Sequence, residues 1–261
     1  MSGGRVALPT SARLLIVAAA AGGAAVLALH LPSAASWGPL EAMSWSLLVL
    51  AMVVTEQFPI SLQHRGEGET FSVTDAIWVA ALILVPPAVL ILAAAAGALI
   101  GQIVQRVALT KICFNLGQYL VGLALAVLVY QLLDAGSPTE PRTWLAAASA
   151  MAVFFLVNEG AVASIISLVS GKDLREVLLP SLPISVLHWA GNMAIGILGA
   201  ALWVTVPAAT ALLVAPLGLS YLAYRGWLRS MRERDEMREI ARIADEITEQ
   251  KDLARRLTVS D

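Results

Sequence analysis

The sequence predicts an all-α protein: a polytopic membrane bundle of seven to eight helical segments, followed by a C-terminal cytoplasmic signalling helix. Of its 261 residues, 58% are hydrophobic and 14% are charged, against about 45–50% and about 25% in soluble domains. The charges are also unevenly placed, because 8 of the 17 Lys/Arg and 9 of the 19 Asp/Glu residues lie in positions 228–261. Residues 1–227 therefore form the predicted transmembrane domain, and residues 228–261 form the predicted cytoplasmic linker. This composition excludes a soluble enzyme, a nucleic-acid binder and a disordered chain for the first 227 residues.

The membrane segments follow from runs of apolar residues, since a crossing needs about 20 of them. The candidate segments are 14–31, 43–58, 73–86, 88–105, 111–133, 143–169, 186–206 and 208–227. The segment 73–86 is short. It is either a separate crossing or the first half of one long helix that is kinked at Pro86-Pro87.

Lys and Arg, which are enriched in cytoplasmic loops, favour the separate crossing. In that arrangement only Arg142 falls outside, whereas a single 73–105 crossing would invert every later loop. Ser72 and Asp75 have the spacing of a capping box, which predicts a helix start near residue 73. Two successive prolines also suit a turn better than a helix interior. We therefore expect a multi-pass protein of the cell (inner) membrane with both termini in the cytoplasm.

The first segment has a second interpretation. Arg5 and Arg13, a 16-residue apolar run and Ser33-Ala34-Ala35 also match a signal peptide with a cleavage site. Because the run is long for the apolar core of a signal peptide, we expect an uncleaved helix. Cleavage would remove this crossing without changing the sidedness of the others.

Small residues are frequent in the segments, and Gly97 and Gly101 form a G-x-x-x-G pattern. This spacing lets membrane helices approach closely. We expect it to pack helices within one bundle, with a dedicated dimerisation face as the alternative.

Polar side chains inside the segments mark the candidate site, because such groups are costly at membrane depth and usually face the bundle interior. Glu159 is the strongest signal, since it lies ten or more residues from either end of its segment. Tyr119 shares a helix face with Asn115 and Gln118. Glu56 lies near the cytoplasmic end of its segment. The predicted ligand-binding residues are Asn115, Gln118, Asn158, Glu159, His188 and Asn192. The alternative is that these groups act as polar clamps between helices.

Catalytic and metal chemistry are not indicated. The chain has one cysteine, Cys113, and three histidines, none of them paired at the spacing of metal ligands. It has no H-E-x-x-H, G-x-S-x-G, P-loop or dinucleotide motif. We therefore expect no catalytic residue, no metal, no cofactor and no nucleic-acid partner.

The C-terminal linker, or tail, is predicted to form one helix, since residues 228–257 contain no Pro or Gly. Ile240, Ile243 and Ile247 fit a coiled-coil pattern, and a second register through Met237 overlaps it. We expect a parallel homodimer through 228–257 with two packings; the alternative is a solvated single helix. Gly226 is the one weak point where the tail joins the last segment.

Several short motifs together resemble a known region of bacterial signalling proteins. They are Thr55-Glu56-Gln57-Phe58-Pro59, Phe71-Ser72-Val73-Thr74-Asp75-Ala76, Pro86-Pro87, and Phe114-Asn115 with Gln118-Tyr119. Over residues 45–230 the chain resembles the N-terminal multi-helix membrane sensor region that precedes diguanylate cyclase (GGDEF) or HD-type phosphodiesterase domains. The segment 253–261 is similar to the helix that leads into a GGDEF domain.

The resemblance implies a membrane signal-input module that relays ligand or membrane state to a cyclic-dinucleotide-type output domain. No catalytic motif of that family is present, so we expect the output domain to be fused in a longer protein or recruited as a cytoplasmic partner. The alternative is a substrate-binding membrane subunit of a vitamin-type transporter, which has similar Ala/Gly-rich helices. A charged tail of about 30 residues has no evident use in such a subunit.

Overall fold

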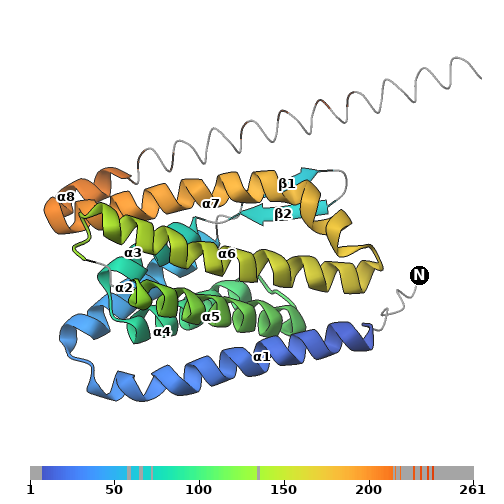
Figure 1. Ribbon diagram of the computed structural model, residues 1–261, viewed down its shortest axis with the longest axis horizontal. Helices are drawn as coiled ribbons and strands as arrows, with labels where there is room; N and C mark the ends of the chain where they lie inside the picture. The colour runs from blue at the N-terminus through green and yellow to red at the C-terminus, as the bar shows by residue number, and fades with distance from the viewer. Residues whose placement is uncertain are drawn as a thin grey trace, which may run out of the picture. The chain divides into compact units, whose positions relative to one another are not determined.

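The computed structural model describes residues 8–57, 60–64, 67–71, 73–133 and 136–213, with isolated positions at 215, 218, 226, 230, 234 and 237. The long helices are α1 (Thr10–His30), α2 (Pro39–Glu56), α4 (Pro87–Val104), α5 (Leu109–Leu132), α6 (Pro141–Ser170) and α7 (Leu174–Thr205) (Figure 1). The shorter elements are η1 (Leu31–Ser36), β1 (Ile60–His64), β2 (Glu67–Phe71), α3 (Thr74–Leu84), α8 (Pro207–Thr210) and η2 (Ala211–Leu213).

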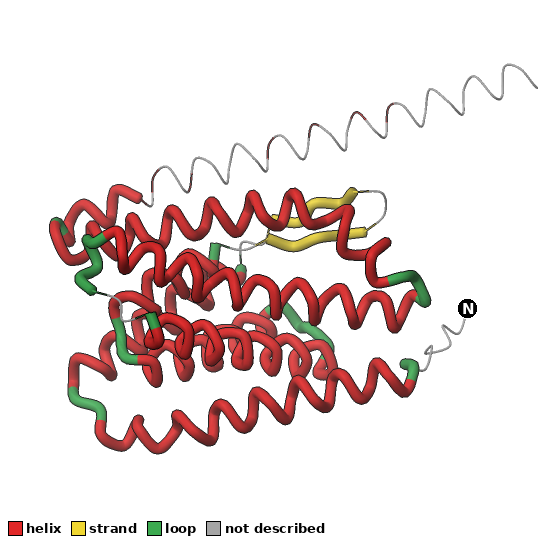
Figure 2. The backbone as a smooth tube through the Cα atoms, viewed as in Figure 1, coloured by secondary structure: helices red, strands yellow, loops and turns green. Residues whose placement is uncertain are grey.

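The predicted bundle of apolar helices is confirmed. All six long helices are long and apolar enough to cross a membrane. The strands β1 and β2 form a two-stranded hairpin, which the sequence analysis does not include (Figure 2). The predicted segment 208–227 and the tail lie mostly outside the described residues. By contacts, residues 1–59 and 70–210 form one compact unit, the helix bundle, and residues 60–69 and 211–261 form another.

Prolines and a glycine set several of the helix ends. Pro39, Pro87 and Pro141 are the first residues of α2, α4 and α6, where a missing N–H leaves no hydrogen bond unmade. Gly171 ends α6 in the left-handed conformation (φ 72°), which glycine adopts without a steric penalty. These local signals explain why predicted and observed ends of α2 and α4 to α6 agree within about four residues.

The helix α7 begins earlier than expected. The sequence analysis starts this segment at residue 186, whereas the helix begins at Leu174 and includes Pro180 and Pro183. The Asp173 side chain accepts a hydrogen bond from the Arg175 N–H (3.0 Å), which caps the new start. The prolines and nearby charges interrupt the hydrophobic pattern but lie within the first three turns of the helix.

The chain reverses at Pro86-Pro87. Val85 is extended (φ −126°, ψ 158°), so the backbone leaves the helical conformation there. Thr74 at the start of α3 and Gly101 near the end of α4 both lie against Glu56 at the end of α2. One continuous helix would hold residues 74 and 101 about 40 Å apart. The helices α3 and α4 are therefore antiparallel, and the kinked-helix alternative does not describe this chain.

Glycines allow the closest helix contacts. Gly23 of α1 meets Gly117 of α5, and Gly196 of α7 meets Ala76 and Val79 of α3. Gly97 and Gly101 of α4 lie against Met52 and Glu56 of α2, so α2 and α4 run side by side in the same direction. The G-x-x-x-G pattern thus packs helices within the bundle, as expected.

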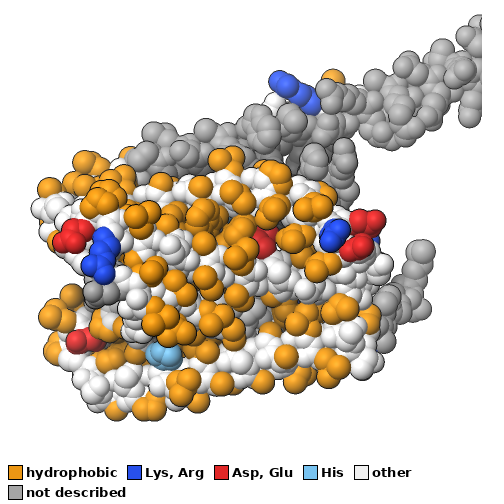
Figure 3. All heavy atoms as spheres, viewed as in Figure 1, with side chains coloured by type: hydrophobic (Ala, Val, Ile, Leu, Met, Phe, Trp, Pro, Cys, Tyr) orange, Lys and Arg blue, Asp and Glu red, His pale blue; other side chains and the backbone are white. Residues whose placement is uncertain are grey.

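The hydrophobic core lies between α3, α4, α5 and α6. Its largest fully buried side chains include Trp78, Leu90, Leu123 and Met151. In contrast, α1 and α2 leave many large apolar side chains exposed, such as Leu29 and Leu40. Hydrophobic side chains cover most of the face of the bundle in Figure 3, and charged side chains gather mainly near the helix ends. This distribution suits a protein whose outer surface contacts lipid.

Candidate functional site

A layer of hydrogen-bonded side chains crosses the bundle where α2 ends and α3 begins. The Gln118 amide nitrogen of α5 donates to Asn158 Oδ1 of α6 at 3.0 Å. One turn earlier on α5, the Asn115 amide nitrogen donates to Gln102 Oε1 of α4, also at 3.0 Å. These two bonds join three consecutive helices at one level.

The helices α2 and α3 meet in the same layer. The Thr55 and Thr74 hydroxyl oxygens lie 2.9 Å apart, and the Thr74 hydroxyl donates to Glu56 Oε1 at 3.5 Å. The Gln105 amide nitrogen donates to the Glu56 carbonyl oxygen, which ties the end of α4 to the end of α2. Glu56 therefore occupies the junction of three helices.

The helix α7 adds two polar groups. The Asn192 amide nitrogen and His188 Nε2 lie 2.8 Å apart, one turn apart on the same face. One further turn along this face, Gly196 packs against Ala76 and Val79 of α3. This contact places Asn192 near the level where α3 begins.

Three carboxyl groups lie within electrostatic range in this layer. Asp75 of α3 interacts with both Glu56 of α2 and Glu159 of α6. The Tyr119 hydroxyl of α5 interacts with Glu56 and Asp75. We call the whole set the polar layer. It consists of Thr55, Glu56, Thr74, Asp75, Gln102, Asn115, Gln118, Tyr119, Asn158, Glu159, His188 and Asn192.

An aromatic cluster covers the polar layer on one side. The Trp78 ring lies edge-on to Tyr119 and Phe154, with centroid distances of 5.3 and 5.1 Å. Within the described part of the chain, the buried Trp78 Nε1 and Gln118 Oε1 have no hydrogen-bond partner. A buried donor and a buried acceptor therefore remain unpaired at the junction of α3, α5 and α6, where burial makes unpaired groups costly.

The six predicted site residues take part in four interactions, two of which join predicted residues to each other. Gln118 and Asn158 bond each other directly, and His188 and Asn192 form a pair on α7. Asn115 bonds Gln102 instead of another predicted residue, and Glu159 lies in range of Asp75. That all six bind one ligand stays a prediction.

Four residues of the polar layer are not among those predicted from the sequence as site residues: Thr55, Thr74, Asp75 and Gln102. Asp75 is interpreted from the sequence as part of a capping box with Ser72, which lies outside the described residues; the N-cap of α3 is Val73, which makes no side-chain capping hydrogen bond. The missed residues all stand at the ends of their apolar segments, where polar side chains are ordinary. A signal was nevertheless present, since Thr74 and Asp75 follow Glu56 across a short connection and precede a buried helix.

Metal binding and similarity to known proteins add little to this picture. In the described ranges, no group of three or more His, Cys, Asp or Glu side chains is arranged to hold a metal ion. No protein-family model matches this chain, and no curated protein matches it either. Six of the described helices are long and apolar enough to cross a membrane, and the polar layer is the feature described above that has the chemistry of a binding site.

Proposed function

We propose that this protein is a membrane signal-input module. In this proposal a small ligand binds at the polar layer, and the C-terminal helix 228–257 relays the change as a parallel homodimer. The output is a cyclic-dinucleotide-type domain, fused or recruited in the cytoplasm. The chain itself performs no catalysis, and it lies in the cell inner membrane with both termini in the cytoplasm.

The observation that carries this proposal is that buried hydrogen-bonding atoms in and beside the polar layer lack partners among the described residues. Polar side chains that serve only as clamps between helices would satisfy one another, because lipid offers no alternative partners. Here Gln118 Oε1 and Trp78 Nε1 are buried and unpaired among the described residues, and Asp75 lies within electrostatic range of both Glu56 and Glu159. A ligand that carries both donor and acceptor groups would complete these interactions.

The positions of basic residues support the sidedness. The helix pairs α4–α5, α5–α6 and α6–α7 are antiparallel, as the contacts between residues 102 and 115, 118 and 158, and 151 and 189 require. The start of α1 and the α6–α7 connection lie at the same end of the bundle (Figure 1). That end carries Arg13, Arg106, Lys111, Lys172 and Arg175, whereas the opposite end carries Arg142 among the described residues. Positive charge is favoured on the cytoplasmic side.

The route from the polar layer to the tail starts on α7. This helix carries His188 and Asn192, and α8 follows it at Pro207. The isolated described positions 226, 230, 234 and 237 are helical, Gly226 included. We propose that a rotation or a slide of the bundle is transmitted from α7 to the tail. The remaining tail residues that the proposal uses lie outside the described part of the chain.

The experiment combines tail cross-linking with variants of the polar layer. Single cysteines at Ile240, Ile247 and Arg238 are introduced into a Cys113→Ala background and oxidised in native membranes. We expect cross-links between subunits at Ile240 and Ile247 but not at Arg238, because only the first two lie on the apolar stripe. Glu159→Gln should then change the ratio of the two cross-links, since it removes a carboxyl group from the polar layer.

Gly160→Ala is the matched control, because an added Cβ at this neighbouring position meets nothing within 4 Å. Equal cross-linking at all three cysteines, or none, would remove the case for a signalling helix. Cross-links that form normally but ignore Glu159→Gln would show that the polar layer is only structural.

A further inference from the structure

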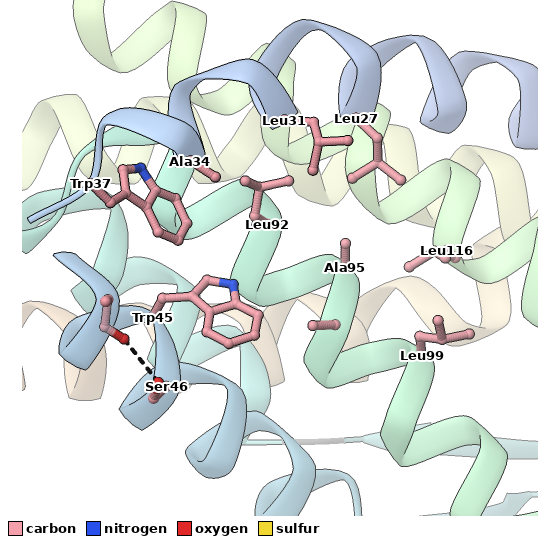
Figure 4. A pocket seen from close by; sticks show the side chains of 12 residues that line it. Leu27, Leu31, Ala34, Trp37, Trp45, Ser46, Leu92, Ala95, Leu99 and Leu116 are labelled. Carbon is pink, nitrogen blue, oxygen red and sulfur yellow. Dashed lines mark hydrogen bonds between the residues drawn. The ribbon is translucent and has the colours of Figure 1, made fainter.

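An apolar groove of about 570 Å³ runs along the bundle on the side of α1 and α2. The helices α1, α2, α4 and α5 and the segment η1 enclose it, and its walls include Leu27, Leu31, Trp37, Trp45, Leu92 and Leu99 (Figure 4). None of the side chains that line it is charged. Its volume lies in the range of small-molecule sites, about 300–1,000 Å³.

One buried polar group in the groove has no hydrogen-bond partner among the described residues. The Ser46 hydroxyl donates to the Ala42 carbonyl oxygen at 2.8 Å, so it is satisfied. The Trp45 indole nitrogen is buried and makes no hydrogen bond within the described chain. Since a buried indole N–H usually finds an acceptor, an occupant of this groove would carry an oxygen there. The rest of the occupant must be apolar.

The length of the groove matches one leaflet of a bilayer. Met52 lies against Gly97, and Glu56 against Gly101, so residues of α2 lie beside α4 residues 45 positions later. Ala42 therefore lies near the level of residue 87, and the groove extends from there to Leu99. These 12 residues correspond to about 18 Å along α4. Half of the hydrocarbon core of a bilayer is about 15 Å.

The two tryptophans lie at one end of this length. The Trp37 and Trp45 ring centroids are 6.5 Å apart, and both rings face the groove (Figure 4). Tryptophan is enriched at the boundary between lipid tails and headgroups. Around the groove, Leu29 and Leu40 are 78% and 71% exposed, so the apolar surface beside it is open to lipid.

We propose that this groove binds one acyl chain of a glycerophospholipid, whose ester carbonyl oxygen accepts a hydrogen bond from the Trp45 indole N–H. The chain lies along Leu92 and Leu99, and the ester lies at the tryptophan end. The ester is the acceptor that membrane lipids carry at this depth, directly beside an apolar chain. This site is separate from the polar layer and does not depend on the proposed signalling function.

Native mass spectrometry of the full-length protein tests the proposal. The purified protein is delipidated in detergent and titrated with two phosphatidylethanolamines that have equal chains, one ester-linked and one ether-linked. We expect one lipid to be retained, with the ester form preferred by about two- to tenfold, the range of a single hydrogen bond. Trp45→Phe should remove this preference, because it keeps the aromatic ring and deletes the N–H.

A second pair of variants tests the position of the acyl chain. Ala95→Phe places a ring in the groove and should abolish retention of both lipids. Ile100→Phe is the matched control on the same helix, since Ile100 is exposed and does not line the groove. Circular dichroism and the thermal midpoint establish that each variant is folded. If Ala95→Phe does not fold, the ester preference of Trp45→Phe alone decides the result.

Three results would overturn the proposal. The first is that no lipid is retained. The second is an ester preference that is unchanged in Trp45→Phe, which would place the lipid elsewhere or identify a nonspecific contact. The third is a dimer that persists at all lipid concentrations and loses its stability in Ala95→Phe, which would identify a second copy of the chain as the occupant.

Discussion

Gly117→Ala should displace α1 from its packed position and destabilise the bundle. An added Cβ at this position would lie 2.7 Å from the Ala20 backbone nitrogen and would also meet the Ala19 carbonyl group. Ordinary contact starts at 3.4 Å, so α1 must move by at least 0.7 Å. Backbone atoms cannot rotate aside as a side chain can. Because α1 packs chiefly on α5, the movement affects its main contact with the rest of the bundle.

The expected magnitude follows from overpacking in a tight contact, which costs about 1–3 kcal/mol of unfolding free energy. The measurement is reversible unfolding in mixed micelles with increasing sodium dodecyl sulfate, followed by circular dichroism. Gly160→Ala serves as the control, because its Cβ meets nothing and alanine favours the helix by up to about 1 kcal/mol. The two variants should therefore differ in sign.

A double variant sharpens this test. An added Cβ at Gly23 would lie 2.7 Å from the Gly117 Cα, so both glycines serve the same contact. Once Gly117→Ala has moved α1, Gly23→Ala should cost less than it does alone, and the two effects should not add. Equal stabilities of Gly117→Ala and Gly160→Ala would refute the packing argument.

Two further predictions concern the polar layer and the sidedness. Gln118→Leu should destabilise the bundle by about 1 kcal/mol, because Asn158 loses its 3.0 Å hydrogen bond while an unpaired buried oxygen is removed as well. Unfolding in mixed micelles measures this change in stability. A loss above about 3 kcal/mol would contradict this balance of the two effects. In a Cys113→Ala background, a cysteine at Lys172 should react with an impermeant maleimide only from the cytoplasmic side, and one at Ser137 only from the opposite side. Labelling of both from one side would reject the proposed arrangement of the helices.

Sequence alone determined the class of this protein and most of its helices. Hydropathy and the positions of Pro and Gly act locally, so the boundaries of α4 and α5 follow from residues that lie next to one another in the chain. The depth of Glu159 within α6 was predictable for the same reason. For α7, the rule that proline stands at or before the start of a helix was misleading, because Pro180 and Pro183 lie inside the helix.

The tertiary structure decided which polar groups meet. Asp75 has the spacing of a cap, yet it lies within range of Glu56 and Glu159, which are 19 and 84 positions away in the sequence. Asn115 bonds Gln102 because α4 and α5 are antiparallel, and no periodicity within either helix specifies that register. The reversal at Pro86-Pro87 brings Thr74 and Gly101 to the same residue, Glu56. Hydrophobicity selects which faces of the helices are buried, but close packing between particular helices sets the level at which their polar side chains meet.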